Sequence, residues 1–348
     1  LGESYWQKYQ ATHAAEWMTR ALEACQKAAA LGEGAICLGH VYNETGNYEQ
    51  AGSEFRRALQ VDPTSDDAYR GLGFAYEHLG KTAEAEQTYR RAITVRPQYW
   101  AGYNWLGAFL VRQARLREAA QMFHQVMALA PDNIRGCSNL GGVYTLLGRY
   151  EEAIPVLTRC LAIEPTAAVY SNLATVYFYL RRYDQAANSY ERALKLDEKN
   201  YILWGNLGEA YYWTPERRDQ AAGAYRQAIS YAGQAEAVNP KDPHVLAQLA
   251  AYHAMLGESK PAREYIGRAL ALSAGDADLQ FKAALIEQRL GQPERALAWL
   301  EKAVSAGLSA SEIRNNPLFD NLTGNQRFQQ LLQAKPEPLK QGPQKSSP

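Results

Sequence analysis

Apolar residues along most of this chain recur three and four positions apart, which is the spacing of one face of an α-helix. The stretches that show this spacing come in pairs. In one pair, Tyr69, Leu72 and Tyr76 share a helix face, and Gly80 interrupts the pattern before a second face begins at Ala85. The pattern therefore predicts an all-α chain built from consecutive helical hairpins.

Two columns of small residues repeat through these hairpins with a period close to 34 residues. The column in the first helices comprises Gly39, Gly73, Gly107, Gly141, Ala174, Gly208, Ala250 and Ala284. The column in the second helices comprises Ala51, Ala85, Ala119, Ala153, Ala186, Ala221, Ala262 and Ala296. One hairpin cannot bury its own apolar face, so the columns predict eight stacked repeats over residues 32–310 that form an α-solenoid.

Prolines mark the ends of the second helices in the first half of the array. They are Pro63, Pro97, Pro131 and Pro165, each 34 residues after the last. Proline lacks an amide hydrogen and disfavours helix in the residue before it, so each second helix should end just before its proline.

The order of residues within a repeat resembles the tetratricopeptide repeat. In the first repeat this order is Leu38-Gly39, Tyr42, Ala51, Phe55, Ala58 and Pro63. The resemblance covers roughly four fifths of the chain and implies a right-handed superhelix of about eight helix pairs. It also implies that the first helices line a concave groove, and that the partner is a protein or an extended peptide.

The two ends of the chain depart from the repeat. Residues 1–31 are expected to form an irregular leading unit whose first helix is truncated, as in a domain cut from a larger protein. Residues 311–334 carry an apolar pattern that suits a capping helix, which an array needs at its open end. Residues 335–348 are rich in proline, lysine, glutamine and serine, so we expect a disordered tail.

Repeat six is longer than the others. Seven more residues separate Ala228 from Pro240 than separate Ala58 from Pro63. Seven residues make about two helical turns, so the second helix can lengthen without rotating its apolar face. A one-residue insertion also falls near Thr214-Pro215. The longer repeat is either a tolerated length change or a change of superhelix direction that shapes a binding surface.

Composition excludes several classes of function. The formal charge is zero, so there is no basic footprint for nucleic acid, and no apolar run reaches the length of a membrane span. The six histidines and four cysteines lack the spacing of metal ligands, so we expect neither a metal nor a cofactor. No motif for a catalytic nucleophile, a phosphate-binding loop or a kinase catalytic loop is present, so we do not expect an enzyme.

The cysteines allow two interpretations. Cys137 and Cys160 fall at opposite ends of the two antiparallel helices of repeat four, so they can lie close in space. The favoured interpretation is that the cysteines are small, buried and unpaired, and a disulfide is the alternative.

Candidate ligand contacts begin with a series of asparagines. Asn139, Asn172 and Asn206 precede the leucine of the first helix in repeats four, five and six, and Asn104 stands one position earlier in repeat three. An asparagine side chain both donates and accepts, so such a series can hold the backbone of an extended peptide. The series resembles the asparagine ladder of O-linked N-acetylglucosamine transferases. The alternative is that these amides bond their own scaffold.

Two aromatic residues and three basic residues extend the predicted site. Tyr179 and Tyr212, near the ends of the first helices of repeats five and six, are expected to anchor a ligand, with packing inside the array as the alternative. The basic residues expected to favour acidic segments, on the first helices of repeats two to four, are Arg70, Arg112 and Arg135.

A second resemblance concerns the biological setting. The segments that carry it are Trp100-Ala101-Gly102-Tyr103-Asn104, Leu203-Trp204-Gly205-Asn206-Leu207, Trp213-Thr214-Pro215 and Asn325-Gln326-Arg327-Phe328. They resemble the C-terminal repeat regions of bacterial receptor-type serine/threonine protein kinases and related signalling proteins. This resemblance implies a sensor or docking module, a soluble domain on either side of the membrane.

The function predicted from the sequence is thus a non-catalytic scaffold that binds an extended partner. One alternative is a self-associating spacer that forms a homodimer. Another is the substrate-recognition arm of an enzyme whose catalytic domain precedes Leu1.

Overall fold

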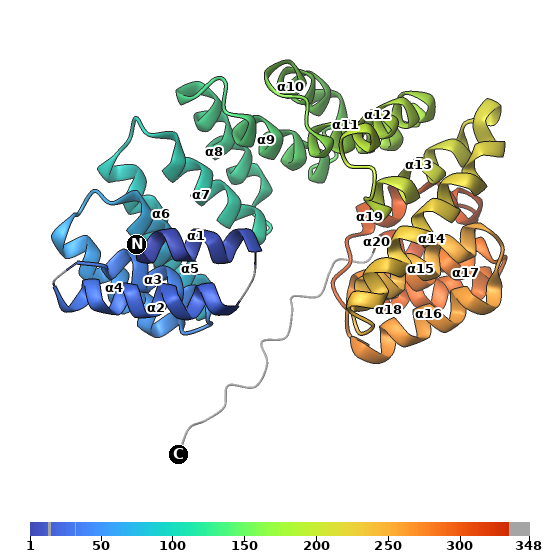
Figure 1. Ribbon diagram of the computed structural model, residues 1–348. Helices are drawn as coiled ribbons and strands as arrows, with labels where there is room; N and C mark the ends of the chain where they lie inside the picture. The colour runs from blue at the N-terminus through green and yellow to red at the C-terminus, as the bar shows by residue number, and fades with distance from the viewer. Residues whose placement is uncertain (13–14, 32, 334–348) are drawn as a thin grey trace. The chain divides into compact units, whose positions relative to one another are not determined.

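The structure is a computed structural model that describes residues 1–12, 15–31 and 33–333 (Figure 1). The predicted disordered tail at residues 335–348 lies outside the described residues. The described residues form α-helices and two short 3-10 helices, with no β-strand among them. The chain divides into two compact units, which we call the N-terminal half (Leu1–Glu164) and the C-terminal half (Pro165–Pro348).

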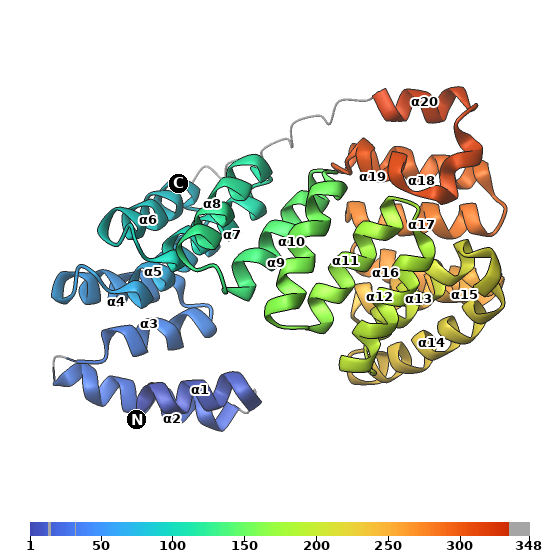
Figure 2. The ribbon, with the colours of Figure 1, turned by 90° about the horizontal axis from the view of Figure 1, so that it is seen from above.

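Helices of the N-terminal half pack in consecutive pairs, as Figure 1 and Figure 2 show. They are α1 (Gly2–Thr12), α2 (Ala15–Ala30), α3 (Ala35–Glu44), α4 (Tyr48–Val61), α5 (Asp66–His78), α6 (Thr82–Val95), α7 (Trp100–Arg112), α8 (Leu116–Leu129), α9 (Ile134–Leu146) and α10 (Tyr150–Ile163). The leading unit is the pair α1–α2, and repeats one to four are the four pairs that follow.

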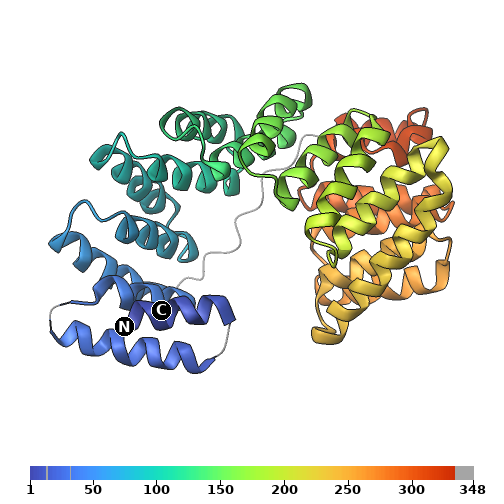
Figure 3. The same cartoon turned by 45° about the horizontal axis from the view of Figure 1, so that its top comes forward.

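The C-terminal half continues with the same pairing, seen from another side in Figure 3. Its elements are α11 (Ala167–Tyr179), α12 (Tyr183–Leu196), α13 (Tyr201–Trp213), η1 (Pro215–Gln220), α14 (Ala221–Val238), α15 (Pro243–Met255), α16 (Ser259–Leu272), α17 (Ala277–Arg289), α18 (Pro293–Ser305), α19 (Ala310–Asn315), η2 (Pro317–Leu322) and α20 (Gln326–Gln333). Each of repeats five to eight is one helix pair. The predicted all-α class and the repeated hairpins are confirmed.

Most first helices begin at a residue whose side chain caps the helix. Each cap accepts a hydrogen bond from a backbone N–H two or three residues further on, which satisfies a donor that the helix itself leaves open. The capping residues are Ser65, Asn133, Thr166, Asn200, Asp242 and Asp276. These local signals explain why the helices begin where they do.

The small residues of the first column allow close contact within a hairpin. A Cβ atom added at Gly73 would lie 2.4 Å from the ring of Tyr89 on the second helix, and one added at Gly208 would lie 2.8 Å from Tyr225. Those distances are far inside van der Waals contact, so only glycine lets these rings occupy the space between the paired helices.

The longer second helix predicted for repeat six is confirmed. Helix α14 has 18 residues, whereas α12 has 14, and it runs without interruption to Val238. The extra residue near Thr214-Pro215 is accommodated by the 3-10 helix η1, which replaces the usual tight turn.

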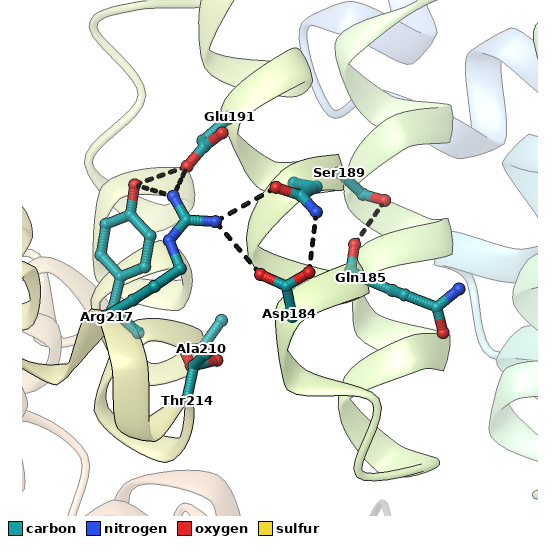
Figure 4. A network of polar contacts seen from close by, with 9 residues as sticks. Asp184, Gln185, Ser189, Glu191, Ala210, Thr214 and Arg217 are labelled. Atoms are coloured by element: carbon teal, nitrogen blue, oxygen red, sulfur yellow. Dashed lines mark hydrogen bonds and ion pairs between the residues drawn. The ribbon is translucent and has the colours of Figure 1, made fainter.

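A polar network holds η1 against α12 (Figure 4). The guanidinium group of Arg217 forms an ion pair with Glu191 and donates to the side-chain oxygen of Asn188 at 3.1 Å. It also donates to the hydroxyl of Tyr211 at 3.0 Å, and Asp184 lies 3.5 Å from Nη1. One side chain thus joins the irregular turn of repeat six to the second helix of repeat five.

We expect Arg217→Ala to lower the free energy of unfolding of the C-terminal half by about 2 kcal/mol, because hydrogen bonds to charged groups contribute about 1.5–3 kcal/mol each. Urea unfolding followed by circular dichroism measures the change. Arg226→Ala is the matched control, since Arg226 lies exposed on α14. Equal stability of the two variants would contradict a structural role for the network.

The cap at the end of the array differs from the single helix predicted. It consists of α19, η2 and α20, because Pro317 cannot continue a helix and Asn316 instead caps η2 by accepting from the backbone N–H of Leu318 at 3.0 Å. Phe319 and Phe328 are buried in the core of this segment. The cap therefore covers the last repeat with three short pieces that share one apolar cluster.

The four cysteines form two disulfides, so the favoured interpretation of unpaired cysteines is wrong. Cys25 on α2 is bonded to Cys37 on α3, and Cys137 on α9 is bonded to Cys160 on α10. The Cα atoms lie 5.7 Å and 5.8 Å apart, within the usual range for disulfides. Both pairs arise because adjacent packed helices place two cysteines at the same level. The positions of Cys137 and Cys160 in one hairpin allowed that pairing as the alternative, whereas a bond between Cys25 and Cys37 was not expected.

Candidate functional site

Two of the predicted asparagines meet in the N-terminal half. The side-chain amide of Asn139 on α9 donates to the side-chain oxygen of Asn104 on α7, with 3.1 Å between the two atoms. Both side chains are half-buried. The contact agrees with the scaffold interpretation at this level, although an amide that makes one hydrogen bond still has donors and lone pairs for a ligand.

The three predicted arginines have different surroundings. Arg112 donates from two nitrogens to the carboxylate of Glu77, each at 2.7 Å, and this contact raises the pKa of Arg112. Arg70 pairs with Asp67 on its own helix at 3.0 Å. Arg135 is exposed. Arg112 and Arg70 thus each have a carboxylate partner in the scaffold, whereas Arg135 is exposed.

Arg70 also borders a hollow in the N-terminal half, together with Trp6, Phe74 and the buried His40. Burial lowers the pKa of His40 to about 4, so the imidazole is neutral at pH 7. Glu44 lines the same hollow, so its lining contains one cationic and one anionic side chain around the neutral imidazole.

In the C-terminal half, Asn172 on α11 and Asn206 on α13 are both half-buried. Asn206 lies near the hydroxyl of Tyr190, and that hydroxyl is hydrogen-bonded to the hydroxyl of Thr175 at 3.0 Å. Burial raises the pKa of Tyr190 above the ordinary value, so this hydroxyl stays protonated.

Asn206 borders a hollow of this half, which we call the α13–α15–α17 hollow. It encloses about 530 Å³, including the part that is open to solvent. Its polar lining residues are Asn206, Glu209, Gln248, Lys282 and Arg289. Its apolar lining residues include Ala251, Met255, Leu285 and Leu318. Three consecutive first helices, α13, α15 and α17, therefore supply most of the lining of the hollow, and η2 of the cap contributes Leu318.

The position of Leu318 is set by hydrogen bonds. The side-chain amide of Gln288 on α17 donates to the backbone oxygen of Leu318 at 3.1 Å and to the side chain of Asn321 at 2.7 Å. Asp320, two residues after Leu318, accepts two hydrogen bonds from Arg181, at 2.6 Å and 3.0 Å. These contacts keep Leu318 at the edge of the hollow.

Most residues that line this hollow were not among the ligand contacts predicted from the sequence. Gln248 and Lys282 occupy the repeat position that Asn206 occupies, two residues before the small residue of the first column. Glu209 follows Asn206 by three residues and so lies on the same helix face. Aligning the last repeats on the small-residue column, regardless of residue type, would have found Gln248 and Lys282.

The charges in the hollow are not paired with one another. The ammonium group of Lys282 donates to the side-chain oxygen of Gln248 at 2.9 Å, and burial lowers the pKa of Lys282. Burial raises the pKa of Glu209, and the positive charges of Lys282 and Arg289 oppose that shift. No ion pair joins any of these three groups to another residue in the described part of the chain, whereas Arg263 on α16 pairs with Glu287 at 3.0 Å.

The predicted aromatic contacts lie in the same half. Tyr212 on α13 is half-buried between two guanidinium groups, those of Arg289 at 4.0 Å and Arg218 at 5.1 Å from its ring centre. Tyr212 is therefore linked to the α13–α15–α17 hollow through Arg289. Tyr179 is 37% exposed and contacts the ring of Phe178, so more of its surface is exposed than for the half-buried Tyr212.

Metal sites and membrane spans are absent from the residues that the structure describes. Within residues 1–12, 15–31 and 33–333, no three side chains of histidine, cysteine, aspartate or glutamate gather closely enough to hold a metal ion. None of the helices in the described ranges combines the length and apolarity that a membrane span requires.

Comparisons with known proteins address the family. Family models described as "Tetratricopeptide repeat" match residues 136–199 and 171–228, and another of that description matches residues 67–99 and 277–306. A model described as "TPR repeat" matches residues 39–80. No curated protein sequence matches the chain at a significant level.

Solved structures resemble the chain through the same repeat. A thermophilic TPR protein from Thermus thermophilus is 27% identical over 51% of this chain and 96% of its own, with a TM-score of 0.42. PilF of Pseudomonas aeruginosa is 24% identical over 66% of this chain and 99% of its own, with a TM-score of 0.50. The Cut9–Hcn1 hetero-tetramer of the APC/C is 15% identical over 91% of this chain and 60% of its own, with a TM-score of 0.52. By the family models that match them, the repeated hairpins of this chain are tetratricopeptide repeats.

Proposed function

We propose that this chain is a non-catalytic scaffold that holds an extended segment of a partner protein along its first helices. The tetratricopeptide fold favours this role because stacked hairpins offer a continuous surface built from equivalent positions of successive repeats. In the C-terminal half we place the main contact in the α13–α15–α17 hollow.

One observation carries the proposal. Asn206, Gln248 and Lys282 stand at equivalent positions of three successive repeats, and all three side chains line one hollow. Their amide and ammonium groups can donate to the carbonyl oxygens of an extended peptide, and the two amides can also accept from its N–H groups. A peptide that crosses the three helices would meet one such group at each repeat.

The other predicted contacts extend the proposal. Asn172 and Tyr179 are proposed to continue the contact in the C-terminal half, with Tyr212 beside the hollow. In the N-terminal half, Asn104 and Asn139 can contact a ligand through the amide donors and acceptors that their mutual hydrogen bond does not use. Arg70 and Arg135 offer positive charge there. A role as the docking module of a signalling protein, an upstream kinase domain and self-association remain predictions from the sequence.

A random dodecapeptide library displayed on phage tests the proposal. We expect the native chain to enrich a set of peptides, and we expect the double variant Asn206→Ala with Gln248→Ala to bind the best synthetic peptide about tenfold or more weakly, since each lost hydrogen bond contributes about 1 kcal/mol. Fluorescence anisotropy of the labelled peptide measures the affinity.

The matched control replaces two exposed amides on a second helix, Gln227→Ala with Gln234→Ala on α14. This control should bind as the native chain does. Circular dichroism establishes that both double variants are folded. Failure to enrich any peptide, or equal affinity of the two double variants, would count against the proposed site.

A further inference from the structure

The α13–α15–α17 hollow contains more positive than negative charge. Lys282 and Arg289 stand seven residues apart on α17, which is two helical turns, so both side chains lie on one face and line the hollow. Glu209 on α13 is the single acidic residue in the lining. The formal charge of the lining is therefore +1, because two cationic side chains face one carboxylate.

These cations lack the partners that other cations between helices have. In the same half, Arg263 pairs with Glu287 and Arg268 pairs with Glu236 at 2.8 Å. Lys282 is half-buried, but its hydrogen bond goes to the neutral amide of Gln248. A positive group that loses water without gaining a carboxylate is costly, and an incoming carboxylate would restore the missing interaction.

The walls of the hollow suit the rest of an acidic side chain. Met255, Leu285 and Leu318 line it with apolar surface around the polar floor. The methylene groups of an aspartate or glutamate can contact these walls while the carboxylate reaches the floor. Gln248 stands beside Lys282 and can add a hydrogen bond from its amide to the same carboxylate.

We infer that the α13–α15–α17 hollow receives an aspartate or glutamate side chain from the partner segment, and that Lys282 and Arg289 hold its carboxylate. This inference rests on the proposed function and adds the chemical class of the partner. The partner is an extended segment with an acidic residue at the position that enters the hollow, flanked by residues held through their backbone.

Glu209 makes this recognition dependent on pH. When Glu209 is ionised, its carboxylate competes with that of the partner for Lys282 and Arg289. Burial raises the pKa of Glu209, so it becomes neutral at a pH where an exposed acidic residue of the partner is still ionised. Affinity should therefore rise as the pH falls toward the pKa of Glu209, and should fall again once the partner's own carboxylate is protonated.

The other ionisable groups around Glu209 do not change the direction of this pH dependence of the affinity. They are Lys282 and Arg289 on α17, Tyr252 on α15, Tyr225 on α14, and Tyr190 and Tyr183 on α12. The pKa of each of these tyrosines is raised, chiefly by burial, so their hydroxyls stay neutral in the relevant range. Lys282 has a lowered pKa, and losing its proton at high pH would weaken binding further in the same direction.

The experiment starts from peptides that the native chain selects from the random dodecapeptide library. The best peptide is synthesised with an amidated C-terminus, so that acidic side chains are its source of carboxylate. We expect one acidic position to recur, and changing it to the corresponding amide should weaken binding about tenfold or more. Lys282→Met should weaken binding to a similar extent. Glu209→Gln should strengthen it several-fold at pH 7 and flatten its pH profile.

Matched controls carry the same charge changes outside the hollow. Lys260→Met and Glu264→Gln alter exposed residues of α16 and should leave the affinity unchanged. Arg289→Gln provides a second cationic variant if Lys282→Met does not fold. Opposite effects of Lys282→Met and Glu209→Gln would support the inference, because damage to the structure would weaken binding in both variants.

The experiment distinguishes failure of this inference from failure of the proposed function. If selected peptides bind through Asn206 and Gln248 but tolerate the change of acid to amide, the inference is wrong and the proposed function stands. The same conclusion follows if Lys282→Met and Arg289→Gln both leave the affinity unchanged. If the library yields no peptide, the proposed function itself fails.

Discussion

Replacing Phe55 by alanine is expected to lower the free energy of unfolding of the N-terminal half by about 4 kcal/mol, since truncating a buried phenylalanine costs about 3–5 kcal/mol. The ring of Phe55 on α4 is fully buried. A Cβ atom added at Gly39 on α3 would lie 2.6 Å from this ring, and one added at Gly71 on α5 would lie 2.1 Å from it. One side chain thus fills the space that two glycines leave, so its loss opens a cavity shared by two repeats.

Urea unfolding followed by circular dichroism measures this loss, and hydrogen exchange of α3, α4 and α5 localises it. The matched control is Phe74→Ala on α5, because Phe74 is 40% exposed. We expect the control to cost about 1 kcal/mol, as is usual for changes at partly exposed positions. If the two variants lost the same stability, Phe55 would not be the residue that joins the first two repeats.

Removing either disulfide is expected to lower the free energy of unfolding by about 3 kcal/mol, from the loop-closure entropy that the bond removes from the unfolded chain. Cys25–Cys37 closes a loop with a sequence separation of 12, and Cys137–Cys160 closes one with a separation of 23. The longer loop should show the slightly larger loss. Thermal unfolding of the variants Cys25→Ala with Cys37→Ala, and Cys137→Ala with Cys160→Ala, measures each bond separately.

Two controls accompany this prediction. A variant with all four cysteines replaced by alanine should unfold at the same temperature with and without a reductant, whereas the native chain should lose stability when reduced. Mass spectrometry after alkylation in denaturant should find no modified cysteine in the unreduced native chain. Uptake of alkyl groups at these positions without a reductant would show that the bonds do not form.

The helical hairpins were predictable because their signals are local. The spacing of apolar residues, the glycine at Gly73 and the proline at Pro97 act within one or two helical turns, and together they predicted a pair of helices in each repeat. Even the longer helix α14 followed from counting residues between Ala228 and Pro240. The division of the cap was missed, although Pro317 marks the point where a single helix becomes impossible.

The candidate site was predictable only in part. The position of Asn206 in the repeat pointed to a residue that lines the α13–α15–α17 hollow. Residue type, however, hid the equivalent positions, because a search for asparagines passes over Lys282. Arg112 was expected to meet a ligand, yet Glu77 on α5 neutralises it from 35 residues away in sequence. The asparagine pair of the N-terminal half likewise depends on how adjacent first helices pack.

By itself, then, the sequence determined the all-α class and the repeated helix pairs, because these follow from backbone geometry within a few residues. The tertiary structure decided which polar and sulfur-containing groups meet: Glu209 with Lys282 and Arg289 around one hollow, and Cys137 with Cys160 across one hairpin. Such meetings depend on the angle and offset between packed helices. Those quantities are set by the summed contacts of whole hairpins, which no short stretch of sequence encodes.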